Sequence, residues 1–387
     1  MNIVFASLPA YGHLYPMMPL ALACAEAGHE VTMATGEPFL GRLPIRSVRG
    51  VSAALDLDGA VAETRRRHPG IEGLDLTLAL FADTTAEFVS EALIPVLREF
   101  GPDLVVYEAM NVGAGVAADV LGIPAAAFSI GLVHTVVGGI HAAAAEFHRD
   151  QWVRRDLEPP AGTPLLAGAL LDPAPPSLRE PGGGPRITRL PIRPTPFSES
   201  MGEVPGWLSA ARARPCVYVT LGTVSFGAVE VLRRAVDEIA PLDADLLVAV
   251  GPEGDPTALG EVPANVHIER FVAQAAVLPL VDVVVQHGGT GTVLGALATG
   301  LPQLILPQGA DHFFNAGVLS GIGAAQVLRN DEQLPGAIAR SVSAMLTDSP
   351  ERTVARRLAD EITALPAPVD VLPDLQALAD QVTAGRA

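Results

Sequence analysis

The sequence contains no lysine. Its 387 residues include 25 basic side chains of the lysine and arginine type, and each of them is arginine. This absence excludes several reaction classes, because a P-loop, a protein kinase, a serine–lysine hydrolase and a Schiff-base enzyme all depend on a lysine amine. Any site for an anionic ligand in this chain must therefore use other donors.

Positive charge and cysteine are both scarce. With 43 acidic residues the formal net charge is −18, whereas a nucleic-acid-binding protein needs a basic face to neutralise phosphates. We therefore expect no nucleic acid partner and a neutral or carbohydrate-like ligand. The two cysteines, Cys24 and Cys216, lie far apart in apolar surroundings, which excludes a disulfide framework and a zinc site and fits buried thiols in a reducing cytoplasm.

Signals for secretion and membrane insertion are weak. Residues 1–13 lack the basic region and the cleavage site of a signal peptide. Residues 120–145 carry no charged side chain and are long enough to span a bilayer, but they are interrupted by Pro124, Gly131, Gly138, Gly139, His134 and His141. The first part of this stretch is typical of a buried strand. We expect a cytoplasmic protein with no integral membrane span.

Strand and helix patterns alternate in both halves of the chain. Apolar runs that do not alternate with polar residues are typical of parallel strands covered on both faces. Together with the length, they predict an α/β protein with two doubly wound, Rossmann-like domains. Helices are expected at 16–27 and 112–121, and strands at 3–8, 31–35, 104–107, 124–129, 217–221, 246–250, 266–271, 281–285 and 303–306.

A proline-rich segment separates the two halves. Residues 159–205 hold twelve of the 34 prolines, which predicts a linker without a continuous helix or a central strand. We place an N-terminal acceptor-binding domain at 1–197, a C-terminal nucleotide-binding domain at 198–365, and a segment at 366–387 that crosses back to the N-terminal domain. Ligands are expected in a cleft at the carboxyl ends of the two sheets. Residues 55–80 are less regular, and the arginine run at 65–67 favours a solvated face over an anion site.

The strongest local motif follows the apolar run that ends near residue 285. A glycine turn at 288–291 precedes an apolar helix at 293–298, so backbone N–H groups and the helix dipole would favour an anion. His287, Thr290 and Thr292 add donors, and a diphosphate fits this set. The spacing is not that of a dinucleotide-binding GxGxxG turn. The turn at 220–223, with Thr223, is expected at the same sheet edge.

In the first half, a histidine lies between the first strand and the first helix. His13 is expected at the carboxyl end of a strand, where a neutral imidazole can act as a base at physiological pH, although a helix-capping role is equally open. Glu108 follows another strand and is the candidate carboxylate that would hold its tautomer.

These elements together resemble family 1 glycosyltransferases of the GT-B fold, particularly actinobacterial enzymes that decorate antibiotics and other natural products. The resemblance extends over nearly the whole chain. It implies an inverting transferase that uses a nucleotide-activated sugar as a substrate and needs neither a metal nor a cofactor. The segments that carry it are residues 12–16, 271–274, 287–292, 300–302 and 307–312.

The resemblance also implies roles for individual residues. His13 would be the general base and Glu108 its orienting carboxylate, although the family more often has Asp there; Asn111 is the alternative. Asp311 and His312, in place of the frequent Asp-Gln pair, would contact the sugar. The nucleotide and diphosphate would meet Thr223, Phe271, Val272, Gln274, His287, Gly289, Thr290, Gly291 and Thr292.

One departure concerns the donor. Plant members of the family place a Glu eight residues after the phosphate-binding histidine, where it accepts hydrogen bonds from a ribose, whereas this chain has Gly295. The resemblance therefore favours a dTDP-linked donor, with a deoxysugar, over a UDP-linked one.

Signals for the acceptor are softer. We expect an apolar pocket for a hydrophobic aglycone near Tyr11, Phe81, Met110 and His134, with Phe88 and Trp152 also nearby in sequence. His134, His141 and His148 recur every seven residues on one expected helix at 132–155, two turns apart, which is too far for one metal ion. They form either a polar stripe facing the acceptor or a partly exposed helix face.

Other interpretations remain open at this stage. A sugar-nucleotide 2-epimerase shares the fold, and an inactive accessory protein would retain it. The Asp-x-Asp triplets at 56–58 and 243–245 are interpreted as solvated turns, not as a metal site. The sequence also leaves a homodimer open.

Overall fold

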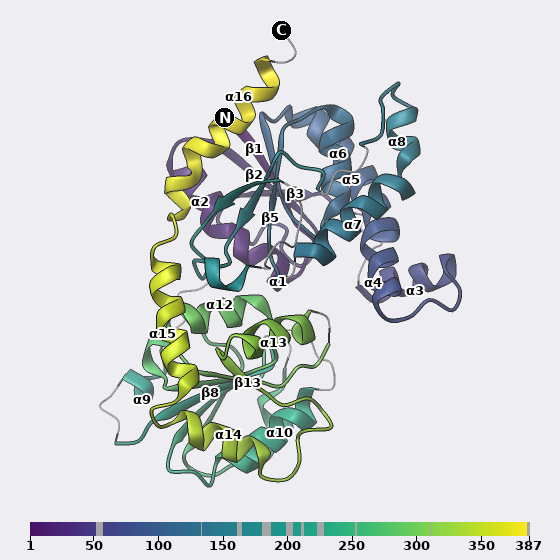
Figure 1. Ribbon diagram of the computed structural model, residues 1–387. Helices are drawn as coiled ribbons and strands as arrows, with labels where there is room; N and C mark the ends of the chain where they lie inside the picture. Colours follow the sequence, from purple (N-terminus) through teal and green to yellow (C-terminus); the bar gives the residue numbers. More distant parts are fainter. Residues whose placement is uncertain are drawn as a thin grey trace. The chain divides into compact units, whose positions relative to one another are not determined.

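The computed structural model describes residues 1–51, 57–132, 134–160, 165–179, 187–198, 204–209, 213–222, 228–251, 254–309 and 311–384. The chain forms two compact units, and the colours of Figure 1 follow the sequence through both of them. Unit 1 comprises Met1–Pro173, Glu180–Arg193 and Pro366–Ala387, and unit 2 comprises Ala174–Arg179 and Pro194–Leu365.

Unit 1 is built on a seven-stranded parallel sheet with strand order β3-β2-β1-β4-β5-β6-β7. The central strands are apolar on both faces because helices cover both sides, as in any doubly wound sheet. The strands are β1 (Asn2–Ala6), β2 (Glu30–Thr35), β3 (Arg46–Arg49), β4 (Leu104–Glu108), β5 (Ala125–Phe128), β6 (Ala169–Asp172) and β7 (Thr188–Pro191).

Unit 2 contains a six-stranded parallel sheet with order β10-β9-β8-β11-β12-β13. The two sheets confirm the predicted α/β fold class. Its strands are β8 (Cys216–Thr220), β9 (Asp245–Ala249), β10 (Val266–Glu269), β11 (Val283–Gln286), β12 (Gln303–Ile305) and β13 (Ala325–Val327).

Helices connect the strands and cover the sheets. In unit 1 they are α1 (Tyr11–Leu14), η1 (Tyr15–Met17), α2 (Met18–Glu26), α3 (Leu57–Arg67), α4 (Gly73–Ala79), the π-helix η2 (Leu80–Thr85), α5 (Ala86–Phe100), α6 (Val112–Leu121), α7 (His134–Phe147), α8 (Arg149–Val153), η6 (Pro368–Val371) and α16 (Leu372–Ala384). In unit 2 they are η3 (Pro176–Leu178), α9 (Gly206–Ser209), α10 (Ala228–Ile239), η4 (Pro256–Leu259), α11 (Gln274–Val277), η5 (Leu278–Leu280), α12 (Thr290–Ala298), α13 (His312–Gly321), α14 (Ala337–Met345) and α15 (Pro350–Thr363).

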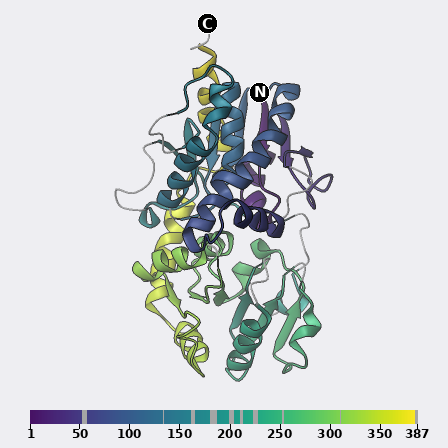
Figure 2. The same ribbon diagram turned by 90° about the vertical axis from the view of Figure 1, so that its right-hand side faces the viewer.

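The C-terminal helix belongs to unit 1, although the long segment before it, Pro194–Leu365, belongs to unit 2. In Figures 1 and 2, α16 runs beside the elements of unit 1. It contacts β5, and η6 contacts α2. The backbone N–H of Arg193 donates to the carbonyl of Pro366 at 2.7 Å. Unit 1 is therefore assembled from both ends of the chain.

The structure corrects the prediction for the proline-rich segment. We expected no central strand there, but β6 lies inside the sheet between β5 and β7. The reason is that β6 itself contains no proline, so every residue of this strand can donate its backbone N–H to a neighbour. Pro191 ends β7, which is an edge strand and tolerates a missing donor.

Other expected elements differ in detail. The irregular stretch before residue 80 contains the helices α3 and α4, and its arginines are not merely solvated: Arg67 pairs with Glu63, Asp83 and Glu87. The expected helix at 132–155 is two helices, α7 and α8, which meet at His148. His13, expected between the first strand and the first helix, lies in a short helix that begins at Tyr11. The short strands β3 and β13 were not predicted.

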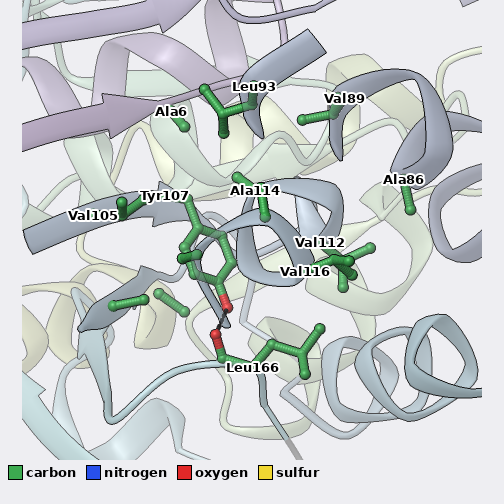
Figure 3. Close-up of a cluster of buried hydrophobic side chains, with 14 of the residues drawn as sticks. Ala6, Ala86, Val89, Leu93, Val105, Tyr107, Val112, Ala114, Val116 and Leu166 are labelled. Carbon is green, nitrogen blue, oxygen red and sulfur yellow. Dashed lines mark hydrogen bonds between the residues drawn. The ribbon is translucent and has the colours of Figure 1, made fainter. Parts of the chain in front are cut away.

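Tyr107, on β4, is one of the largest fully buried side chains of the unit 1 core. Its ring is fully buried, with Val105, Ala114 and Leu166 around it in Figure 3. Its hydroxyl donates to the Leu166 carbonyl at 2.7 Å, the dashed line in that figure. A buried hydroxyl needs such a partner, because leaving it unpaired costs about 1–3 kcal/mol.

His141 of α7 lies in the same core. Its Nε2 donates to the carbonyl of Ala109 at 2.8 Å, while its Nδ1 accepts from the N–H of Leu166 at 3.0 Å. Burial lowers the pKa of His141 to about 4. The histidine therefore joins the loop after β4 to the segment before β6 as a neutral group.

This environment makes unit 1 sensitive to acid. The unfolded chain binds a proton at His141 below about pH 6.5 and the folded chain does not until about pH 4, so stability is lost as the pH falls through this window. We expect the pKa shift of His141 to lower the free energy of unfolding of wild type by about 3 kcal/mol from pH 7 to pH 4. Urea unfolding of wild type and His141→Gln at both pH values measures the difference, in which groups common to both proteins cancel. Equal losses in the two proteins would contradict this account.

No helix in the described part of the chain is both long enough and apolar enough to cross a bilayer. The uncharged stretch from residue 120 instead supplies β5, the end of α6 and the start of α7. Cys24 and Cys216 are both buried, and neither forms a disulfide.

Candidate active site

His13 and Glu108 in unit 1 and His287 in unit 2 end or follow strands at the point where each sheet reverses its strand order. In unit 1, β1 and β4 are neighbours, and the chain leaves them in opposite directions along the sheet. In unit 2, β8 and β11 have the same relation. Connections diverge at such a point and leave room at the carboxyl ends of the strands, which is where ligands bind in open α/β sheets.

His13 and Glu108 meet at this point of unit 1. His13 lies in α1, which follows β1, and Glu108 is the last residue of β4. The Nδ1 atom of His13 is 2.9 Å from Oε1 of Glu108. The carboxylate is fully buried, whereas the side chain of His13 is 23% exposed. Because a carboxylate only accepts hydrogen bonds, Nδ1 carries the proton and the basic lone pair is on Nε2.

Backbone groups after β4 fix the carboxylate. Oε2 of Glu108 accepts from the N–H of Met110 at 2.8 Å, and the Glu108 carbonyl accepts from the N–H of Asn111, also at 2.8 Å. Glu108 thus reaches His13 although an aspartate is the commoner residue in the family that the sequence resembles. Asn111 is buried at the N-cap of α6, and no hydrogen bond joins it to His13 among the described contacts.

One aromatic ring contacts His13, and a separate aromatic cluster forms around Tyr11. Phe81 stacks on the imidazole with 6.4 Å between ring centroids and 22° between planes. It projects from η2, a π-helix, and such helices are frequent at functional sites. Tyr11 makes edge contacts with Tyr15 at 5.1 Å and with the buried Phe39 at 4.9 Å. Sequence reasoning named Tyr11 and Phe81 but missed Tyr15 and Phe39.

The remaining acceptor predictions are partly wrong. His141 and His148 form neither an exposed face nor a polar stripe, since both are buried and His148 donates to the Ala82 carbonyl at 3.0 Å. Trp152 is a core residue whose indole N–H donates to Asp119 at 2.5 Å. Met110 and Phe81 are partly buried against the core. His134 begins α7, but the structure does not describe its side chain. The guanidinium carbon of Arg67 lies over the Phe88 ring, 5.7 Å from the ring centroid.

In unit 2, His287 follows β11 and its ring is enclosed by backbone. A Cβ atom added at Gly289 would lie 2.4 Å from Nε2 of His287, and one added at Gly222 would lie 2.7 Å away. On another side, the ring of His312 is nearly perpendicular to that of His287, and the two ring centroids are 4.5 Å apart. Nδ1 of His287 is buried and has no hydrogen-bond partner among the described residues. The imidazole therefore has a fixed position and an unsatisfied nitrogen.

Burial sets the charge of both histidines. Desolvation, with a smaller contribution from the neighbouring His312, lowers the pKa of His287 to about 3. The pKa of His312 is also lowered by burial, while the adjacent Asp311 opposes the shift. Nδ1 of His312 accepts from the N–H groups of Gln308 and Gly309, at 3.4 and 3.2 Å. Both rings are neutral at physiological pH.

The turn between β11 and α12 is held by side chains on both sides. Gly288 adopts φ of +108°, which favours glycine, and its N–H donates to the buried Gln286 at 2.6 Å. Thr290 and Thr292 lie in the first turn of α12, with Gly289 as N-cap, so the helix begins earlier than predicted. Gln274 donates to the Thr292 hydroxyl at 3.2 Å. We call residues 287–292 the anion turn.

Asp311 also contacts the anion turn. Its Oδ2 accepts from the Thr290 hydroxyl at 3.2 Å and from the amide of Asn315 at 2.8 Å. Sequence reasoning missed Asn315 and Gln286. The signal for Asn315 was available, because it lies one helical turn after Asp311 on α13 and faces the same way.

The other residues predicted to bind the nucleotide-sugar donor differ in exposure. Phe271 is 44% exposed, whereas Val272 is buried beside it. Gly291 lies in α12, and Gly295 faces Leu278, whose Cδ1 is 3.0 Å from the position of a Cβ. Thr223 lies outside the described residues.

The Asp-x-Asp triplets have no metal-like surroundings where they are described. Asp245 begins β9 and pairs with Arg214 at 2.5 Å, and Asp56 lies outside the described ranges. Within those ranges no group of three His, Cys, Asp or Glu side chains is arranged to hold a metal ion.

Two family models match the chain. The model described as "Erythromycin biosynthesis protein CIII-like, N-terminal domain" matches residues 22–222, and the corresponding C-terminal domain matches residues 233–378. The chain belongs to the erythromycin biosynthesis protein CIII-like family. Both domains of this family are therefore present, in order, and the chain is a glycosyltransferase of the GT-B fold class.

Curated relatives of this CIII-like glycosyltransferase are named as sugar transferases. The L-demethylnoviosyl transferase of Streptomyces niveus is 33% identical and aligns with 97% of this chain and 98% of its own. The TDP-daunosamine transferase DnrS of Streptomyces peucetius is 28% identical over 98% of this chain and 97% of its own. Among solved structures, the glycosyltransferase SnogD from Streptomyces nogalater has a TM-score of 0.81 at 28% identity, covering 98% of this chain and 99% of that one.

These matches confirm the predicted resemblance and decide between the alternatives left open by the sequence. The relatives named above are sugar transferases, so the CIII-like chain is a transferase of natural-product biosynthesis rather than a 2-epimerase or an inactive accessory protein.

Proposed function

We propose that this glycosyltransferase moves a deoxysugar from a dTDP-linked donor to a hydroxyl group of a hydrophobic aglycone, with inversion at the anomeric carbon. The observation that carries the proposal is the contact of 2.9 Å between Nδ1 of His13 and the buried Glu108. No lysine and no metal takes part in the proposed reaction.

His13 acts as the general base. Its Nε2 takes the proton from the acceptor hydroxyl as the oxygen attacks the anomeric carbon and the bond to the nucleoside diphosphate breaks. Glu108 holds the tautomer and stabilises the imidazolium that forms, as the aspartate of a catalytic triad does. A single displacement by the acceptor oxygen inverts the configuration of the sugar.

The anion turn binds the leaving diphosphate. Negative charge develops on the phosphate oxygens, and the free N–H groups at the start of α12 with the helix dipole stabilise it. His287 is neutral, so it contributes a hydrogen bond and not a positive charge. A single donor of this kind is worth about 3 kcal/mol in the transition state. Thr223, Thr290 and Thr292 supply hydroxyls, Phe271, Val272 and Gln274 lie against the base, and Asp311 with His312 meets the sugar.

Two observations support a dTDP donor. The relative from Streptomyces peucetius is named a TDP-daunosamine transferase. In this chain, the position at which a ribose-binding acid is expected in plant relatives is Gly295, which faces the apolar Leu278. A deoxyribose needs no acceptor there.

The nucleotide can be tested by thermal shift. At a ligand concentration about 100 times Kd, binding to the native state adds about 2.7 kcal/mol, so the tighter nucleotide gives the larger increase in Tm. We expect dTDP to stabilise the protein more than UDP at equal concentration. The variant His13→Ala serves as a control, because His13 is assigned to the acceptor and its loss should not change the nucleotide shift. A larger shift with UDP would refute the donor assignment.

A further inference from the structure

Asn315 connects the two parts of the donor site. It lies on α13, one helical turn after Asp311, and only 1% of its surface is exposed. Its Nδ2 is 2.8 Å from the Gly288 carbonyl, 3.0 Å from the Thr290 hydroxyl and 2.8 Å from Oδ2 of Asp311. One amide thus donates to a backbone group of the anion turn, to its first threonine and to the carboxylate assigned to the sugar.

The hydrogen bonds of Asn315 leave part of its amide group unsatisfied, which indicates that its N–H donors have a specific role. Oδ1 of Asn315 is buried and has no hydrogen-bond partner among the described residues. An amide carries two N–H hydrogens, so three acceptors within 3.0 Å must share them. An apolar side chain of the same size would leave no orphaned oxygen, but it would release Asp311 and the turn from each other.

The geometry also fixes which oxygen of Asp311 faces a ligand. Both described hydrogen bonds to this carboxylate end on Oδ2, one from Thr290 and one from Asn315. Oδ1 is therefore the oxygen available to accept from a sugar hydroxyl, and its direction is set by the two donors on Oδ2.

We propose that Asn315 is a positioning residue for sugar transfer, which holds the Asp311 carboxylate and the anion turn in a single arrangement and so determines recognition of the donor sugar without touching it. This rests on the proposed function, in that Asp311 meets the donor sugar.

The variant Asn315→Asp tests the role through its pH dependence. It preserves size but places a second carboxylate against Asp311 and removes every donor. Because like charges raise the pKa of one member of a carboxylate pair, acid restores a proton, and the introduced carboxyl group can again donate to Oδ2. Calorimetry with dTDP-glucose is expected to show Kd about 30-fold above wild type at pH 8 and within about 3-fold of wild type at pH 5.

Asn265 provides a matched control. Its amide also donates to two acceptors, the carbonyls of Ala240 and Ala244 at 3.0 and 2.9 Å, but no carboxylate lies among these partners. Asn265→Asp should bind dTDP-glucose as wild type does at both pH values. A loss in Asn315→Asp that is the same at pH 8 and pH 5, or no loss at all, would overturn the role of Asn315.

A ligand-free measurement separates this role from the donor assignment. The raised pKa in Asn315→Asp means that folding stability is regained as the pH falls, so its Tm deficit relative to wild type should shrink from pH 8 to pH 5. In Asp311→Asn/Asn315→Asp the deficit should depend less on pH, because the repulsion between two carboxylates is gone and only burial raises the pKa of the one that remains. If these shifts appear but wild type binds neither dTDP nor dTDP-glucose, the donor assignment fails and the contact of Asn315 with Asp311 stands. A pH-independent deficit in the single variant would overturn the contact itself.

Discussion

Replacing His13 with alanine is expected to lower kcat for sugar transfer by about 10³-fold, within the range that a general base contributes. The alanine leaves Glu108 without its partner at 2.9 Å and leaves no group to take the acceptor proton. Initial rates at saturating donor and acceptor, with the glycoside measured by mass spectrometry, give kcat directly. Binding of dTDP should be unchanged, since the nucleotide contacts are assigned to unit 2.

Glu108→Gln separates orientation from proton transfer. The glutamine can keep an oxygen toward the N–H of Met110, but it then presents an NH₂ group to Nδ1 of His13 and favours the wrong tautomer. A loss of about 10⁴-fold accompanies the analogous change in a catalytic triad. His29→Ala is the control, because this histidine contacts the N-terminal amine of Met1 in the same unit. Full turnover by His13→Ala would remove His13 from the mechanism.

Replacing Gly289 with alanine is expected to lower kcat/KM for the donor by about 10²-fold, comparable to losing one donor to a developing charge. Backbone strain is not the cause, because Gly289 has φ of −66° and ψ of 134°. The new methyl group would lie 2.4 Å from Nε2 of His287, and the ring cannot retreat because Gly222 and His312 close its other sides. Overpacking of this kind also costs about 1–3 kcal/mol of stability.

Gly317→Ala is the matched control for this substitution. Gly317 lies within α13 of the same unit, and a Cβ atom there meets nothing within 4 Å. Alanine in a helix is better than glycine by about 0.5–1 kcal/mol, so this variant should gain stability and keep its donor affinity. Titration calorimetry with dTDP and thermal unfolding of both variants check the pair. Wild-type affinity in Gly289→Ala would show that the position of the His287 ring does not govern binding.

The fold was predictable where hydrophobicity alone decides it. Residues 104–107 and 283–285 are buried on both faces and continuously apolar, and both runs are strands of the doubly wound sheets. The strand β3 escaped prediction because its sequence is Arg-Ser-Val-Arg, with exposed ends, and it forms only by pairing with β2. The strand β6 was missed because proline content was averaged over a segment whose four strand residues contain none.

Site residues were predictable where they follow strands. Carboxyl ends of adjacent parallel strands meet at one edge, so His13 and Glu108 were expected to be neighbours, and they are. Periodicity put His141 and His148 on one face of a helix but gave no indication that this face is buried. That depends on packing against Ala109 and Ala82, which lie 32 and 66 residues earlier in the chain.

The return of the last residues to unit 1 has a consequence for protein engineering. A chimaera made with one crossover between the two family domains would join the η6–α16 segment of one parent to the N-terminal unit of another. That segment packs on α2 and β5. Leu378 of α16 fills the space beside Gly168, since a Cβ atom added to Gly168 would lie 2.7 Å from Cδ1 of Leu378. A chimaera that keeps unit 1 intact therefore requires two crossovers, the first after Arg193 and the second near Pro366, so that the residues up to Arg193 and the C-terminal segment come from one parent.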